Sequence, residues 1–208
     1  MPLLFTREVS PTCKIALWNI TESAEELLVQ LKCKVDPVVL QVHDQLKKQR
    51  ICARLLVNQL SNQPCNELTY DLYSKPALAN SSSKISISHA HEHVAIIVNQ
   101  TKETGIDIEL IKPKVEKIAH RFMSAEELLS VDNTKRTEQL ITYWCAKEAL
   151  YKYYGKKELH FKENILIDPF IQHDSGKIFG RIKTVLINTQ LQLCYEKTGD
   201  YMLVYIND

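Results

Sequence analysis

The amino-acid sequence predicts an α+β protein built from two halves. Strand-like alternation of apolar and polar residues occurs on both sides of a polar connection at residues 100–104, and each side also carries a long helical pattern. The 208 residues are 45% hydrophobic and 25% charged, which is an ordinary globular composition. We therefore expect two domains, residues 1–102 and residues 103–208.

Composition and charge argue against several classes of protein. Lysine and arginine total 26 against 25 aspartates and glutamates, so bulk charge does not favour a nucleic-acid partner. No apolar run approaches the length of a membrane span, and the first nine residues lack the apolar core of a signal peptide. We expect a cytoplasmic protein without a membrane partner, in which all six cysteines are free thiols. These are Cys13, Cys33, Cys52, Cys65, Cys145 and Cys194.

In the first half, capping signals separate the apolar patterns. Asp36-Pro37 is a cap followed by a first-turn proline, and Thr21 is the candidate N-cap of the preceding helix. The continuous apolar run at 93–99 favours a central strand. The elements expected in order are a strand at 14–20, helices at 22–31 and 44–60, a loop or hairpin at 66–80, and strands at 84–89 and 93–99.

In the second half, we expect one long helix and several strands. Ser124 and Glu127 have the spacing of a capping box, which gives Glu127 a structural role. Gly155 follows the longest helical pattern, in the usual C-cap position. The elements expected in order are a strand at 105–109, a helix through 115–122, a capped helical start at 124, a helix at 137–154, and strands at 164–168, 177–183, 184–196 and 201–206.

Two carboxylates share one face of the strand at 105–109. Side chains alternate across a strand, so Asp107 and Glu109 point to one face while Ile106 and Ile108 point to the other. This pattern is typical of a half-buried strand with a solvated outer face. It also suits a shared Mg²⁺ ion, because hard cations prefer oxygen ligands. The strand pattern alone leaves both interpretations open.

A third carboxylate, Glu148, falls on the apolar stripe of the long helix, one turn after Trp144. A carboxylate on a packed face needs a partner, because an unpaired buried charge is costly. Lys152, four residues later, is well placed for a local ion pair. The alternative partner is a cation that Glu148 shares with Asp107 and Glu109. The helix alone does not decide between them.

Several basic residues are candidates for binding a phosphorylated substrate. His89, His91 and His93 are spaced as if to share a strand face, but metal sites usually draw ligands from several segments, so we favour phosphate binding for His89. There is no glycine-rich phosphate loop and no nucleophile elbow. The pattern favours metal-assisted phosphoryl chemistry on a nucleophile supplied by another molecule. The candidate donors are Lys48, Arg54, Lys75, His89, Lys147 and Lys152, although charges on the 44–60 helix are also typical of a solvated face.

Two separated motifs resemble the signature of the 4′-phosphopantetheinyl transferases. Gly105-Ile106-Asp107-Ile108-Glu109 is similar to G-[IV]-D-x-E, and the run from Trp144 to Lys152 is similar to W-x-x-K-E-A-x-x-K. Lys75-Pro76 and Ile87-Ser88-His89 resemble upstream elements of the longer, Sfp-type branch, in the same order. After the last lysine the family usually has a second glycine, where this chain has Glu158.

The resemblance implies a Mg²⁺-dependent transfer of 4′-phosphopantetheine from coenzyme A to a serine of an apo acyl, polyketide or peptidyl carrier protein. It implies that Glu148, or a metal-bound water, deprotonates that serine, and that Lys152 neutralises phosphate charge. The implied metal ligands are Asp107, Glu109 and Glu148, and the implied coenzyme-binding residues are Lys48, Arg54, Lys75, Pro76, Ser88, His89, Lys147 and Lys152.

The resemblance also implies a fold and a division of labour. The expected fold is a monomer of two similar α/β halves, related by a pseudo-twofold axis, each with a small, mainly antiparallel sheet packed with a long helix. The first half would bind the adenine and 3′-phosphate, and the second the metal. Two alternatives stay open: another Mg²⁺-dependent phosphoryl-transfer enzyme, or a non-catalytic relative that binds carrier proteins.

Overall fold

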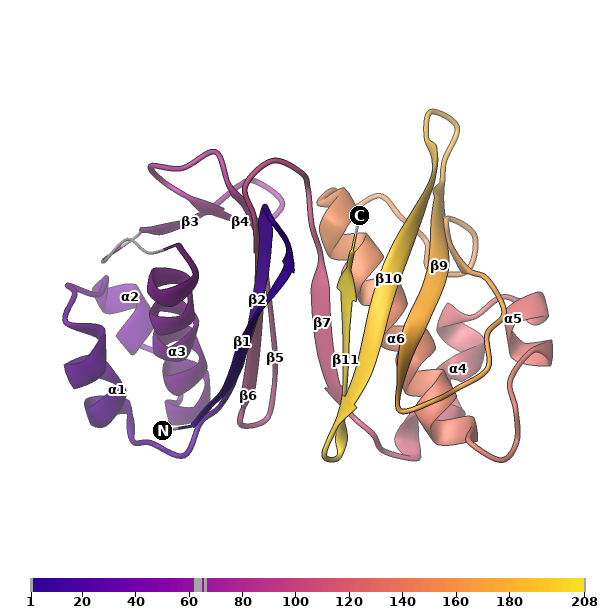
Figure 1. The fold of residues 1–208 in the computed structure, drawn as a ribbon, viewed down its shortest axis with the longest axis horizontal. Coiled ribbons are helices and arrows are strands. Elements are labelled where there is room, and N and C mark those ends of the chain that lie inside the picture. The colour runs from indigo at the N-terminus through magenta and orange to yellow at the C-terminus, as the bar shows by residue number, and fades with distance from the viewer. Residues whose placement is uncertain (1, 62–64, 66, 208) are drawn as a thin grey trace. The chain divides into compact units, whose positions relative to one another are not determined.

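The computed structural model describes residues 2–61, 65 and 67–207. The positions outside it include Met1, in the segment examined for a signal peptide, and Asn66, the first residue of the predicted 66–80 hairpin. The chain divides into two compact units, Met1–Thr104 and Gly105–Asp208 (Figure 1). Each unit is an antiparallel sheet packed with helices, as expected for an α+β protein. The pseudo-twofold relation stays a prediction.

The first unit has a six-stranded antiparallel sheet in the order β1-β2-β6-β5-β4-β3, with its helices on one face (Figure 1). Strand β6 pairs with β2 and β5, so the continuous apolar run is central, as predicted. Its Val94 and Ile96 are buried in one cluster with Ile51 and Leu56 of α3. The elements are β1 (Leu3–Ser10), β2 (Cys13–Asn19), α1 (Ala24–Leu31), α2 (Pro37–Leu40), α3 (Asp44–Ser61), β3 (Leu68–Tyr70), β4 (Pro76–Leu78), β5 (Lys84–Ala90) and β6 (His93–Asn99).

The start of the first unit differs from the prediction in two ways. Strand β1 was not predicted, because it is an edge strand whose exposed Arg7 and Glu8 interrupt the apolar pattern. Thr21 is not the N-cap of α1. Ser23 takes that role in a capping box: its Oγ accepts from the backbone N of Glu26 at 3.2 Å, and its own N donates to the Glu26 carboxylate at 2.8 Å.

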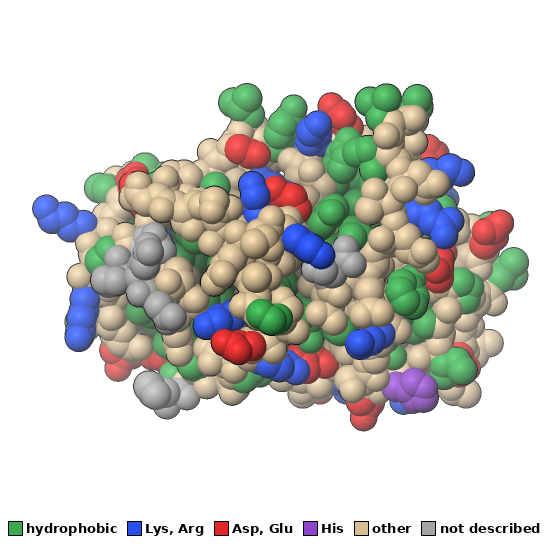
Figure 2. Space-filling view, turned by 45° about the horizontal axis from the view of Figure 1, so that its top comes forward, with side chains coloured by type: hydrophobic (Ala, Val, Ile, Leu, Met, Phe, Trp, Pro, Cys, Tyr) green, Lys and Arg blue, Asp and Glu red, His purple; other side chains and the backbone are tan. Residues whose placement is uncertain are grey.

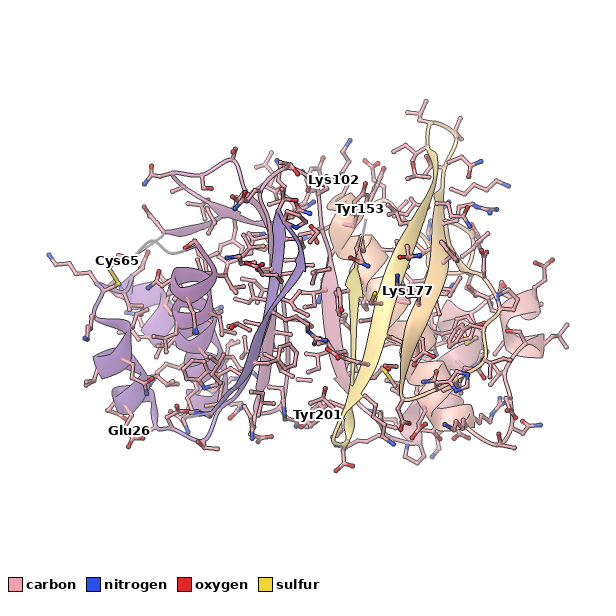
Figure 3. All side chains as sticks on the ribbon, in the orientation of Figure 1. Glu26, Cys65, Lys102, Tyr153, Lys177 and Tyr201 are labelled. Atoms are coloured by element: carbon pink, nitrogen blue, oxygen red, sulfur yellow. A yellow bond between two sulfur atoms is a disulfide. The ribbon has the colours of Figure 1, made fainter. Side chains whose placement is uncertain are left out.

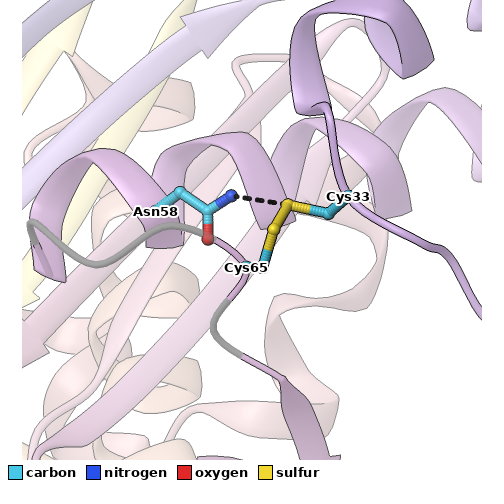
Figure 4. Close-up of a disulfide and its surroundings, with 3 residues drawn as sticks. All are labelled: Cys33, Asn58 and Cys65. Carbon is cyan, nitrogen blue, oxygen red and sulfur yellow. Dashed lines mark hydrogen bonds between the residues drawn. A yellow bond between two sulfur atoms is a disulfide. The ribbon is translucent and has the colours of Figure 1, made fainter.

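Cys33 and Cys65 form a disulfide, which corrects the expectation of six free thiols (Figure 4). It joins the segment after α1 to the segment after α3, across 32 positions and with the Cα atoms 5.5 Å apart. Asn58 of α3 donates a hydrogen bond to Cys33 Sγ at 3.7 Å. Figure 3 places Cys65 on the helical side of the unit. The remaining four cysteines, Cys13, Cys52, Cys145 and Cys194, are free.

The second unit has a five-stranded antiparallel sheet in the order β7-β11-β10-β9-β8. Helix α6 packs on β11, β7 and β8, and α4 packs on α6. Gly155 ends α6 in the left-handed region, at φ 72°, as its C-cap role predicted. The elements are β7 (Ile106–Leu110), α4 (Lys114–Phe122), α5 (Ala125–Leu129), α6 (Arg136–Tyr154), β8 (Ile165–Ile167), β9 (Ser175–Lys183), β10 (Asn188–Thr198) and β11 (Tyr201–Ile206).

Helix α6 is buried over most of its surface, not along a single stripe. Leu140 and Ala149 are buried, and so are polar side chains such as Thr142 and Tyr143. A buried hydroxyl needs a partner, and Tyr143 shares a hydrogen bond of 2.8 Å with Ser130. Across the described residues, no helix is both long and apolar enough to cross a membrane.

Replacing Gly105 by alanine should disrupt the packing of the chain before β7 on α6. A Cβ there would lie 2.0 Å from the carbonyl oxygen of Ala149 and 2.9 Å from its carbonyl carbon. A helix backbone cannot move aside as a side chain can, so we expect Gly105→Ala to lower the free energy of unfolding by about 3 kcal/mol or more. Urea unfolding followed by circular dichroism measures the change.

Gly199→Ala is the matched control in the same unit. Nothing lies within 4 Å of a Cβ at that position, and only its positive φ of 58° opposes alanine. We expect a loss of about 1–2 kcal/mol from that conformation alone. Equal losses in the two variants would contradict the close approach at Gly105.

Candidate active site

Two of the predicted site carboxylates lie where β7 meets α6. Asp107 is only 3% exposed and Glu109 is half-buried. Both side chains contact α6, Asp107 through Lys152 and Glu109 through Trp144. They therefore share the face of β7 that packs on the helix, as the alternation predicted. A solvated outer face is the wrong interpretation for Asp107, because α6 covers it.

Lys152 forms its ion pair with Asp107. Its Nζ lies 2.8 Å from Asp107 Oδ1 and also donates to the carbonyl oxygen of Ile106 at 3.0 Å. Within the described residues, no ion pair joins Lys152 to Glu148, so the local pair that the helix suggested is not formed. Trp144 Nε1 donates to Glu109 Oε1 at 3.3 Å. These contacts tie both β7 carboxylates to the helix that carries Glu148.

The three carboxylates act on one another electrostatically. Burial raises the pKa of Glu148 to about 7, with the charge of Asp107 acting in the same direction and that of Lys152 against it. Burial also raises the pKa of Glu109, and Asp107 adds to that shift. Like charges disfavour each other's ionised forms when they are close together. A cation bound among these groups would relieve the repulsion.

The donor set fits Mg²⁺ chemically, although the side chains do not surround a common point. Over the described ranges, no three His, Cys, Asp or Glu side chains are arranged to hold a metal ion. The groups are all carboxylates, the ligand type that Mg²⁺ prefers, and burial together with the charge of Asp107 raises the pKa values of Glu109 and Glu148, a shift that nearby positive charge would offset. Lys152 supplies that charge to Asp107. A metal that uses Asp107 Oδ1 therefore requires Lys152 to move.

Lys147 belongs to the core, which corrects its assignment to the coenzyme. Its side chain is fully buried, and its Nζ lies 2.8 Å from Glu127 Oε2. It also donates to the carbonyl oxygens of Phe161 at 2.9 Å and Ile165 at 2.6 Å. Three acceptors satisfy all the donors of an ammonium group. No donor of Lys147 is left for a phosphate.

Glu127 connects three elements of the second unit. The predicted capping box is confirmed, since the backbone N of Ser124 donates to Glu127 Oε2 at 2.7 Å. The backbone N of Ile167 in β8 donates to Oε1 at 2.8 Å, and Lys147 of α6 completes the set. The capping role could be seen in the sequence, but the ion pair could not, because its partners lie on different elements.

In the first unit, Lys75 lies in the connection between β3 and β4, directly before the first residue of β4. Its Nζ lies 2.6 Å from Glu103 Oε2, and the other oxygen of Glu103 lies 3.1 Å from Lys84 Nζ. Pro76 is the first residue of β4. Lys84 and Glu103 were not among the predicted site residues. Nothing in their local sequence marks them, because the cluster depends on strand pairing.

The other predicted residues of this unit have different environments. Ser88 and His89 are adjacent on β5, where Ser88 is buried and His89 is exposed. Lys48 lies on α3 and pairs with Asp44 at 2.9 Å, one turn earlier. On the face drawn in Figure 2, side chains of both charge signs are interspersed, in keeping with the near-zero net charge. Basic residues therefore do not form one continuous surface there.

Arg54 lines a cavity of about 560 Å³ within the helical side of the first unit. Its Nη1 donates to the carbonyl oxygen of Arg50 at 2.9 Å, and burial lowers the pKa of its guanidinium. The disulfide partners Cys33 and Cys65 also line this cavity. Arg54 is half-buried there, so it does not lie on a fully solvated face of α3. Its contact with a coenzyme stays a prediction.

Comparison with known proteins identifies the second unit. Residues 103–205 match a family model described as the 4′-phosphopantetheinyl transferase superfamily. This segment belongs to that superfamily. It contains Asp107, Glu109 and Glu148, so the resemblance of the two motifs is confirmed at the level of the superfamily. Assignment to the Sfp-type branch stays a prediction.

Proteins named as 4′-phosphopantetheinyl transferases match part of this chain. A putative 4′-phosphopantetheinyl transferase of Synechocystis sp. is 32% identical over 111 residues, covering 49% of this chain and 45% of the relative. HetI of Nostoc sp. is 32% identical over 95 residues, covering 41% and 40%. AcpT of Escherichia coli K12 is 31% identical over 107 residues, covering 49% and 54%. The chain thus spans about half the length of the curated relatives it matches.

Replacing Lys147 by methionine should destabilise the second unit. The change leaves Glu127, whose side chain is 4% exposed, as a buried carboxylate without its ammonium partner. Breaking one partner of a buried ion pair costs about 3–5 kcal/mol, and we expect a loss of that size in urea unfolding. Lys156→Met, at an exposed position after α6, is the control and should change stability by less than about 0.5 kcal/mol. Similar losses in both variants would argue against a structural role for Lys147.

Replacing Glu148 by glutamine should stabilise the metal-free protein at alkaline pH. The pKa of Glu148 rises from 4.5 to about 7 on folding, so its ionised form opposes folding. The wild-type protein therefore loses stability as pH rises from 4.5 to about 7, and the glutamine variant does not. The variant's advantage in the free energy of unfolding is about 3 kcal/mol at pH 8 and shrinks as pH falls toward 4.5. Thermal melting with a chelator across this range measures it, and a gap that does not change with pH would contradict the shift.

Proposed function

We propose that the protein transfers the 4′-phosphopantetheine group of coenzyme A to a serine of an apo carrier protein, in a Mg²⁺-dependent reaction. The observation that carries this proposal is the group of three carboxylates on β7 and α6, inside a segment that belongs to the 4′-phosphopantetheinyl transferase superfamily. The names of the matched relatives support the same activity. The products are the holo carrier protein and adenosine 3′,5′-bisphosphate.

Asp107, Glu109 and Glu148 would hold Mg²⁺ against the pyrophosphate of coenzyme A. When bound, the metal polarises the phosphoryl oxygens and offsets negative charge in the transition state. Oxygen ligands and the mutual repulsion of the carboxylates support this role. The three residues come from two elements that Gly105 allows to approach closely. The two backbones are therefore held close together, and Lys152 would leave Asp107 when the metal binds.

Glu148 is our candidate for the general base. Helix α6 carries this carboxyl beside the two carboxylates of β7, and a carboxylate positioned next to the reacting group can act as a general base. It would accept the proton of the carrier serine as that oxygen attacks the β-phosphoryl group. Lys152, released from Asp107, would donate to the phosphate oxygens and neutralise charge on the departing bisphosphate. We leave Lys147 out of the phosphate site because its donors are satisfied in the core.

We assign residues 1–102 to the adenine and 3′-phosphate of coenzyme A, and residues 103–208 to the metal and the chemistry. On this proposal the protein is a monomer of the Sfp-type branch, with its halves related by a pseudo-twofold axis. Lys75 and the exposed His89 are our candidates for the adenine and 3′-phosphate end of the coenzyme, with Pro76 and Ser88 next to them in the chain. Lys48 is the half-buried α3 candidate, and it would have to leave Asp44.

Incubation with coenzyme A, Mg²⁺ and an apo acyl carrier protein tests the activity. Intact mass spectrometry should show a mass gain on the carrier equal to one phosphopantetheine group. The same reaction with a chelator in place of Mg²⁺ is the control and should show none. Absence of the gain with acyl, polyketide and peptidyl carriers would refute the proposal. Binding of a carrier without modification would favour the non-catalytic alternative.

Glu148→Gln should abolish transfer while coenzyme A still binds. The amide keeps the shape of the side chain but cannot accept the serine proton, so we expect the rate to fall by about 10²–10⁴-fold. Mass spectrometry measures transfer, and isothermal titration calorimetry measures coenzyme binding. Glu158→Gln, an exposed change beyond α6, is the matched control. Undiminished transfer in Glu148→Gln would remove Glu148 from the mechanism.

A further inference from the structure

A single carboxylate, Glu103, holds two lysines together in the first unit. Its Oε2 lies 2.6 Å from Lys75 Nζ, and its Oε1 lies 3.1 Å from Lys84 Nζ. Each oxygen therefore bonds a different ammonium group. A phosphate group, whose oxygens are separate acceptors, can bridge two lysines in the same manner. Glu103 thus occupies both lysines in the way that a bound phosphate group would.

The backbone fixes all three residues of this cluster. Asn99 Oδ1 accepts two backbone N–H groups of the following turn, each at 3.0 Å, which folds the connection that presents Glu103. Asp71 Oδ1 accepts the backbone N–H of Lys75 at 2.8 Å and so fixes the turn before β4. Lys84 begins β5 and pairs there with β4. The charged ends of the three side chains thus stand on a defined backbone frame.

The cluster is partly open to solvent, and in it one carboxylate bonds to two ammonium groups. The side-chain exposures are 19% for Lys75, 40% for Glu103 and 46% for Lys84. Burial acts to raise the pKa of Glu103, but hydrogen bonds and charge from the two lysines outweigh it, so the pKa lies below its usual value. Two ammonium groups then face one carboxylate. A dianionic phosphate in its place would balance the charge fully.

A structural clamp is the simpler explanation of this contact. Glu103 would then only fasten the connection to β4 and β5, and partly exposed ion pairs contribute at most about 1 kcal/mol each. The two explanations predict opposite effects on ligand binding. Removing a clamp loosens the site and weakens a ligand. Removing a competitor frees the lysines and strengthens a ligand that carries phosphate.

We propose that Lys84 is a second phosphate-binding residue beside Lys75, and that Glu103 is a built-in competitor that occupies both lysines until a phosphate monoester displaces it. For the identity of the ligand this inference rests on the proposed function, which makes the phosphate the 3′-phosphate of coenzyme A. A ligand without that phosphate leaves Glu103 in place. Glu103 thereby sets how strongly the protein distinguishes phosphorylated from dephosphorylated coenzyme.

Calorimetric titration of the full chain with coenzyme A and with dephospho-coenzyme A, both with Mg²⁺, tests the proposal. Glu103→Gln should tighten coenzyme A about fivefold, because the competing ion pair is worth about 1 kcal/mol, and should leave dephospho-coenzyme A within about twofold. Lys84→Gln should weaken coenzyme A by about fivefold or more and spare the dephospho form. Glu25→Gln, an exposed change of the same charge on α1, is the control and should alter neither.

Unchanged or weaker coenzyme A binding in a folded Glu103→Gln variant would overturn the competitor role. Equal weakening of both ligands by Lys84→Gln, or a wild-type protein that does not distinguish them, would overturn the phosphate assignment. If Glu103→Gln does not fold by circular dichroism, Glu103→Ala is titrated in its place, with the same expected tightening of coenzyme A. Transfer to a carrier without these selective effects rejects this inference alone. Selective effects without transfer support the cluster and contradict the proposed function.

Discussion

The second unit depends on the close approach of two backbones, at Gly105 and at Ala149 of α6. The absence of a side chain at Gly105 lets the chain enter β7 against the helix. The next residues then bring Asp107 and Glu109 onto α6, where Lys152 and Trp144 contact them. A wider spacing would admit water between strand and helix and weaken every one of these contacts. The contacts of the two carboxylates with α6 thus depend on the absence of a side chain at Gly105.

In each unit, a charged side chain of the protein occupies a group that the proposed ligand would bind. In the second unit, Lys152 occupies an oxygen of Asp107 that the proposed reaction gives to a cation. In the first unit, Glu103 occupies two ammonium groups that the proposed reaction gives to a phosphate. An unpaired charge in a partly buried site is costly, so a chain that folds without its ligands needs such temporary partners. The ligand-free protein is then stable, and part of the binding energy is spent on displacing them.

Local patterns predicted the features that depend on neighbouring residues. Strand alternation placed Asp107 and Glu109 on one face, the Ser124 spacing located a capping box, and Gly155 marked the end of α6. Contacts between distant segments could not be predicted from the sequence. The pair of Lys147 with Glu127 turned a predicted phosphate ligand into a core residue, because burial depends on tertiary packing. Strand alternation and cap spacing are informative for residues that one element presents together, whereas the two separated motifs were informative through their resemblance to the superfamily.

The disulfide between Cys33 and Cys65 has a consequence for the integrity of the chain. The bond closes the chain from Cys33 to Cys65 into a covalent ring that includes both α2 and α3. A single backbone break inside this ring does not separate the pieces while the bond is intact, whereas the same break in the reduced chain divides it in two. A single proteolytic cleavage on the helical side of the first unit therefore leaves the protein in one covalent piece under oxidising conditions. Under reducing conditions the same cleavage separates it into two fragments.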